Sequence, residues 1–86
     1  MKLLKFGASW CGPCRVLEKQ LEGFDTCELE VYDVDKDDVE DYINKFSIRN
    51  IPVMVLLDDN GEVLKKWVGL VNVEHLKKEI EEFKAK

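Results

Sequence analysis

The chain has 86 residues, a formal net charge of -5 and hydrophobic residues at 45% of its positions. This length suits one domain, residues 1–86, with a modest core, and the acidic balance argues against nucleic acid as the main partner. No apolar run approaches the roughly 18 residues of a membrane-spanning helix, and the N-terminal apolar run is too short for a signal peptide. If the sequence is complete, we expect a cytoplasmic protein without a membrane partner.

The first predicted elements are a strand and a helix. Residues 3–8 are mostly apolar, which is typical of a central strand covered on both faces. A helix is expected from Pro13, because proline is favourable in a first helical turn, and Gly23 is placed to end it. Its buried stripe has helical spacing and consists of Val16, Leu17 and Leu21.

A second strand and a second helix follow. The alternation over residues 28–34 predicts a strand parallel to the first, joined to it by a right-handed crossover. The acidic run at 35–38 then favours the start of a helix, where negative charge is stabilising. The expected buried face of this helix is Val39, Tyr42, Ile43 and Phe46.

The last part of the chain predicts a hairpin and a final helix. Residues 53–57 form a continuous apolar strand, and Asn60-Gly61 is a strong signal for the turn to an antiparallel edge strand at 62–68. Asn72 is a plausible N-cap of the last helix. Its apolar stripe is Val73, Leu76, Ile80 and Phe83. The predicted fold class is therefore α/β, in the order βαβαββα, with a four-stranded mixed sheet flanked by three helices.

Two cysteines lie at the predicted start of the first helix. Cys11 and Cys14 are three positions apart, with Gly12 and Pro13 between them and Trp10 before them. This spacing lets them close a small disulfide, and the positive end of a helix stabilises a thiolate. A thiolate with a second thiol in reach can attack another protein's disulfide, after which the second thiol resolves the mixed disulfide. The pair therefore predicts thiol–disulfide exchange.

Other interpretations of these residue types are weaker. A zinc site needs four ligands, and the remaining candidates are only Cys27, His75 and carboxylates, so we favour redox chemistry and expect no metal. An odd number of cysteines fits a reducing compartment, with Cys27 as a small, buried or half-buried side chain rather than a regulatory thiol. His75 is expected to be solvated and far from the dithiol, which argues against a Cys-His hydrolase.

The motifs together resemble those of the thioredoxin family. The resemblance covers nearly the whole chain and comprises Trp10-Cys11-Gly12-Pro13-Cys14 after a strand, Ile51-Pro52 before another strand, Asn60-Gly61 and Val68-Gly69. The extra N-terminal strand and helix usual in thioredoxins are missing, so the chain is similar to a short, glutaredoxin-sized member. The resemblance implies the thioredoxin fold and a protein-disulfide reductase.

The resemblance also implies roles for individual residues. Cys11 would be the attacking nucleophile and Cys14 the resolving thiol. Pro52 would be a cis-proline facing the dithiol, Ile51 would offer backbone hydrogen bonds to an extended substrate segment, and Gly69 would leave room for it. The full implied substrate-binding set is Trp10, Gly12, Pro13, Ile51, Pro52 and Gly69.

The implied partners are disulfide-containing proteins and a thioredoxin reductase linked to NADPH or ferredoxin. No cofactor would be bound beyond the redox-active disulfide, and a monomer is expected. Two alternatives are a glutaredoxin-like enzyme that draws electrons from glutathione and a binding module for one protein partner with the dithiol as a redox switch.

Two positions depart from the family pattern. Many thioredoxins carry a buried aspartate six residues before the first cysteine, as proton acceptor for the resolving thiol, and that position is Lys5 here. A lysine often found on the next central strand is replaced by Val31. A Lys5 side chain that points inward would favour a thiolate through its positive charge, although burial would favour the neutral form of the lysine. A Lys5 side chain that points outward would only cover apolar surface with its stem. Lys5 is therefore predicted to tune the site, and water is an alternative proton acceptor for Cys14.

Overall fold

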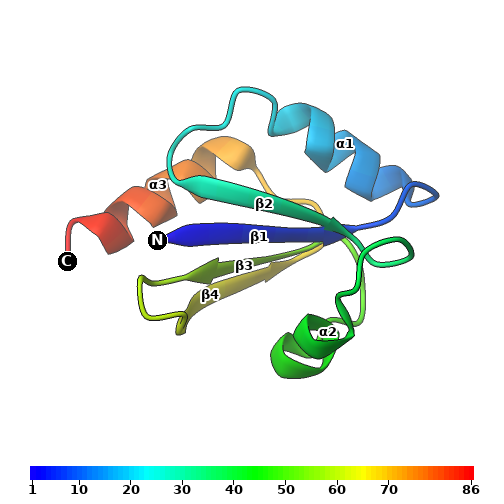
Figure 1. Cartoon of the computed structure of the whole chain (residues 1–86). Helices are drawn as coiled ribbons and strands as arrows, with labels where there is room; N and C mark the ends of the chain where they lie inside the picture. Colours follow the sequence, from blue (N-terminus) through cyan, green and yellow to red (C-terminus); the bar gives the residue numbers. More distant parts are fainter.

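The computed structural model describes all of residues 1–86 and contains four strands and three helices (Figure 1). In chain order they are β1 (Lys2–Gly7), α1 (Gly12–Gln20), β2 (Glu28–Asp33), α2 (Glu40–Phe46), β3 (Val53–Leu57), β4 (Val63–Val68) and α3 (Val73–Lys84). The predicted order βαβαββα is confirmed, and each strand boundary agrees with the prediction to within one residue. None of the three helices combines the length and apolar character needed to cross a membrane.

The sheet has the strand order β2-β1-β3-β4. The β1–β2 pair is parallel, while β3 is antiparallel to both β1 and β4, so the sheet is mixed as predicted. β1 and β3 are central and almost entirely buried, which explains their continuous apolar sequences. Because β1 and β3 run in opposite directions, the end of β1 and the start of β3 lie at the same edge of the sheet.

Helices cover both faces of the sheet (Figure 1). On one face, α1 and α3 pack against strand residues that include Leu3 and Met54. On the other face, α2 packs against strand residues that include Phe6 and Val53. Successive strand residues point to opposite faces, so neighbouring residues of each central strand belong to different cores. Lys5 therefore belongs to the face of Leu3, under α1.

One residue of the predicted α1 stripe is placed wrongly by the sequence analysis. Leu17 is fully buried and Leu21 nearly so, but Val16 is 47% exposed. Val16 lies about 100° around the helix from Leu17, since an α-helix has about 3.6 residues per turn. Its side chain therefore points to solvent, and Cys14 takes the remaining buried position of the helix.

The acidic run at 35–38 does not start a helix, contrary to the prediction. The backbone N–H of Asp35 donates to the Asp33 carboxylate, and that of Asp33 donates to the Asp37 carboxylate. These side-chain hydrogen bonds hold residues 33–37 in a turn, which is how short acidic side chains compete with helix formation. The helix α2 starts only at Glu40, with Val39 as its N-cap residue.

Candidate functional site

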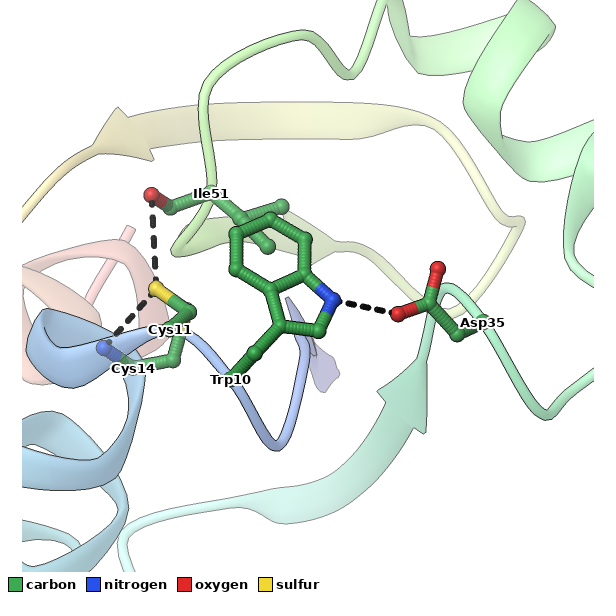
Figure 2. Close-up of a disulfide and its surroundings, with 5 residues drawn as sticks. All are labelled: Trp10, Cys11, Cys14, Asp35 and Ile51. Carbon is green, nitrogen blue, oxygen red and sulfur yellow. Dashed lines mark hydrogen bonds between the residues drawn. A yellow bond between two sulfur atoms is a disulfide. The ribbon is translucent and has the colours of Figure 1, made fainter.

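The dithiol lies at the N-terminus of α1, directly after the loop that leaves β1. Cys11 is the N-cap residue of α1 and forms a disulfide with Cys14, with the two Cα atoms 5.2 Å apart. The backbone N–H of Cys14 donates to Cys11 Sγ at 3.2 Å (Figure 2). Pro13 occupies the first helical turn, where its missing N–H leaves no gap in the hydrogen bonding.

The two cysteines differ in their surroundings. Cys11 Sγ takes the place that an N-cap oxygen occupies in other helices, so it faces the unpaired N–H groups and the positive end of the helix dipole. Cys14 lies inside the first turn and is only 2% exposed. Negative charge on sulfur is therefore stabilised more directly at Cys11 than at Cys14, which fits Cys11 as the nucleophile.

The loop before β3 lies against the dithiol. The Ile51 carbonyl oxygen is 3.9 Å from Cys11 Sγ (Figure 2), and the Ile51–Pro52 peptide bond is cis, as the resemblance implies. The Pro52 carbonyl accepts a hydrogen bond from the Gly69 N–H at 2.8 Å, so the residue after β4 is held beside the same loop. Gly69 has a φ of +84°, which L side chains rarely adopt, and a Cβ there would meet no atom within 4 Å.

Trp10 is an exposed part of the site. Its side chain is 68% exposed, and its indole Nε1 donates to the Asp35 carboxylate in the acidic turn (Figure 2). Gly12 and Pro13 are exposed beside it. Sequence reasoning missed Asp35, which it assigned to a solvated helix start. The pairing of β1 with β2 was a usable signal, because residues that follow two parallel neighbouring strands lie at the same sheet edge.

Lys5 points inward. It is 3% exposed, and it pairs with Val31 of β2 and Met54 of β3. Burial lowers the pKa of the Lys5 ammonium below its ordinary value, although the negative charges of Glu18 and Asp33 oppose this shift. Val31 is 54% exposed, so it does not share the buried environment of Lys5. The open choice between an inward and an outward lysine is thus decided in favour of the inward one.

The remaining candidates lie away from the dithiol. Cys27 is partly buried just before β2, at the sheet end opposite to Cys11, and burial raises the pKa of its thiol. His75 is exposed in the first turn of α3, with its Nε2 3.1 Å from a Glu79 carboxylate oxygen. The structure brings no three His, Cys, Asp or Glu side chains together in a geometry that would bind a metal ion.

The comparisons with known proteins give one family. The sequence matches the Thioredoxin family over residues 1–82. It is 34% identical over 70 residues to thioredoxin of Bacillus subtilis (strain 168), a stretch that covers 78% of this chain and 66% of the relative. It is 32% identical over 84 residues to thioredoxin M4, chloroplastic, of Arabidopsis thaliana, covering 94% of this chain and 43% of the relative. The chain thus spans less than two thirds of the length of these two relatives.

Solved structures agree with the sequence matches. A mutant thioredoxin from Halobacterium salinarum NRC-1 superposes with a TM-score of 0.79 and 33% identity, covering 94% of this chain and 72% of that one. Thioredoxin of Fasciola hepatica superposes with a TM-score of 0.78 and 28% identity, and the match covers 94% of this chain and 78% of that one. The sheet order, the helix placement and the Cys-Gly-Pro-Cys disulfide at the start of α1 fit these matches. The chain belongs to the thioredoxin family.

Proposed function

We propose that this chain acts as a single domain that reduces disulfide bonds in other proteins by cycling between the Cys11/Cys14 dithiol and its disulfide. The observation that supports this most directly is the hydrogen bond from the Cys14 backbone N–H to Cys11 Sγ at the N-terminus of α1. It prepares a site for negative charge on one sulfur, while the second sulfur lies within bonding reach of the first.

The reaction proceeds in two displacements. In the reduced protein the Cys11 thiolate attacks one sulfur of a substrate disulfide, the substrate S–S bond breaks, and the other substrate sulfur leaves as a thiolate. Cys14 then attacks Cys11 Sγ, which breaks the mixed disulfide and forms the Cys11–Cys14 disulfide. Two electrons have passed to the substrate, and a reductase must return two electrons before the next cycle.

The surface around Cys11 supports binding of an extended substrate segment. The Ile51 backbone lies next to the sulfur, where it can pair with the backbone of a segment that carries the disulfide. A Cβ at Gly12 or Gly69 would meet nothing within 4 Å, so the space beside both residues is open to a partner. We assign the exposed Trp10, Pro13 and the loop at Pro52 to the same docking surface.

The partners follow from the reaction. The substrates are disulfide-containing proteins, and the recycling partner is a thioredoxin reductase that draws on NADPH or ferredoxin. We place this activity in the cytoplasm, since the single unpaired Cys27 suits a reducing compartment. The working protein is a monomer that binds no metal or organic cofactor, because both electrons are held by the two sulfurs.

Reduction of insulin with dithiothreitol as electron source tests the proposal. The native chain should accelerate insulin precipitation, Cys11→Ser should abolish the acceleration, and Cys27→Ser is the matched control that should keep it. Equal, slow rates for the native chain and Cys11→Ser would contradict a general reductase. Activity that appears only with glutathione as the electron donor would favour the glutaredoxin-like alternative instead.

A further inference from the structure

Lys5 is the only charged side chain that the fold buries, and it lies behind the resolving cysteine. Both residues face Gly7, the next residue of β1 on the same sheet face. A Cβ added to Gly7 would lie 3.2 Å from Cys14 Sγ and 3.4 Å from Lys5 Nζ. The sulfur and the nitrogen are therefore separated by no more than the sum of these distances. One water molecule, or a small swing of the flexible lysine, spans that gap.

A hollow of about 190 Å³ connects the two groups to solvent. Lys5, Gly7 and Cys14 line it, together with Glu18 of α1 and Asp33 of β2. Lys5 Nζ makes no hydrogen bond or ion pair within the protein, yet no fully buried side-chain nitrogen or oxygen lacks a partner. The amine must therefore touch the hollow, where water can reach both Nζ and Cys14 Sγ.

The surroundings of Lys5 act on the charge of its amine in two opposite directions. Its neighbours in the sheet, Val31 and Met54, are apolar and carry no charge. The titratable groups that face it are Glu18, Asp33 and Cys14. Burial is the largest influence and lowers the pKa of the Lys5 ammonium, whereas the carboxylates of Glu18 and Asp33 and the water in the hollow favour its positive charge.

We propose that the Lys5 ammonium stabilises the Cys14 thiolate that attacks the mixed disulfide in the resolving step, which deepens the proposed reductase function and rests on it. In the mixed disulfide, the proton of Cys14 passes to water in the hollow, and the Lys5 ammonium faces the thiolate that remains. The Cys14 thiolate attacks Cys11 Sγ, the Cys11–Cys14 bond forms, and the bond from Cys11 to the substrate breaks. The substrate leaves as a thiolate that takes up a proton from solvent, and Lys5 keeps its charge throughout.

The same arrangement stabilises the thiolate once it has formed. After the transfer, an ammonium and a thiolate face each other in a largely buried site, where their attraction is stronger than in water. Gly7 leaves room for this, since a Cβ there would press against both the Cys14 sulfur and the Lys5 nitrogen. A lysine at this position thus acts on Cys14 with a charge opposite to that of an aspartate.

Titration of Cys14 alone tests this role. In a Cys11→Ser, Cys27→Ser background, Cys14 is the only thiol, and its thiolate absorbs near 240 nm. Adding Lys5→Met should raise the pH at which half of Cys14 is ionised by about 1–3 units, the range for loss of a close opposite charge. Lys2→Met is the matched control, because Lys2 lies on the same strand and pairs with the remote Glu30. This control should leave the midpoint unchanged.

A rate measurement in the native background completes the test. With a fluorescent peptide disulfide in single turnover, Lys5→Met should slow release of the second thiol at least tenfold at pH 7 and leave mixed-disulfide formation unchanged. An unchanged titration midpoint in folded Lys5→Met, or in Lys5→Gln if the methionine variant does not fold, would overturn the role of Lys5. The titration involves no turnover, so that result would leave the reductase function to be judged by the insulin assay.

Discussion

Replacing Lys5 by methionine is expected to make the oxidised protein more stable at pH 7. Lys5 is 3% exposed and forms no ion pair, so folding removes its ammonium from most of its water without supplying a bonded partner. The attraction of Glu18 and Asp33 and the water in the hollow offset part of this penalty. Methionine has a similar length and no charge, so it fills the site without a new cavity.

The gain in the free energy of unfolding equals the burial penalty of the Lys5 ammonium that remains after this offset. Replacing a buried ion pair by apolar groups of similar volume often stabilises a protein by about 1–4 kcal/mol, and the single charge of Lys5, with its solvent contact, favours the lower part of that range. We expect a gain of about 1–2 kcal/mol. For a domain of this size, each kcal/mol raises Tm by about 4–8 °C.

The gain in stability from Lys5→Met should also decrease as the pH rises. Burial lowers the pKa of Lys5 in the folded protein below the ordinary value of 10.5 that applies to the unfolded chain. Between these two values the unfolded chain binds more protons, so the stability of the native protein rises as the pH rises through that window. The advantage of Lys5→Met should therefore shrink as the pH approaches 10.5.

Urea unfolding of the oxidised protein at pH 7 and pH 10.5 measures both effects. Lys2→Met serves as the control and should change the free energy of unfolding by less than about 0.5 kcal/mol, as is usual for surface substitutions. A Lys5→Met protein that is less stable than the native one at pH 7, or whose advantage does not change with pH, would refute the reasoning. A variant that is more stable and yet slower in resolving mixed disulfides would separate a functional role from a structural one.

Three further outcomes are expected. Asp35→Ala removes the acceptor of the Trp10 indole N–H, so it should lower the free energy of unfolding by about 0.5–1.5 kcal/mol and raise the KM for insulin. Gly69→Ala should cost about 1–2 kcal/mol in urea unfolding because its φ is +84°, whereas Gly12→Ala, inside α1, should be neutral or stabilising. The raised pKa of Cys27 predicts that iodoacetamide alkylates it more slowly at pH 8 than it does free cysteine, and an equal rate would contradict its burial.

The main features of the fold could be predicted because its signals are local. Apolar runs, the Asn-Gly turn signal and helical spacing each concern a few neighbouring residues, and they located all seven elements. The errors at Val16 and at the acidic run have local causes too. Val16 is apolar but lies off the buried side of α1, and the Asp33 and Asp37 carboxylates accept backbone N–H groups in a turn rather than at a helix start.

The assembly of the site at one sheet edge could also be expected from topology. Cys11 follows β1 and Pro52 precedes β3, and these strands are antiparallel neighbours with Phe6 opposite Val53. The two segments must therefore meet, whatever their side chains are. The contact between Trp10 and Asp35 follows in the same way from the parallel pairing of β1 and β2, once the turn after β2 is known.

The orientation of Lys5 could not be predicted from local rules, because those rules oppose it. A lysine amid apolar residues is expected to extend its amine to solvent, and a central strand offers little stability in return for burying an ammonium. The alternation along β1 nevertheless assigns Lys5 to the face of Leu3, under the helix that carries Cys14. A position at which local preference fails in an otherwise consistent sequence is more often functional than accidental. The stability lost at Lys5 is therefore best explained by what its amine does to the thiol beside it.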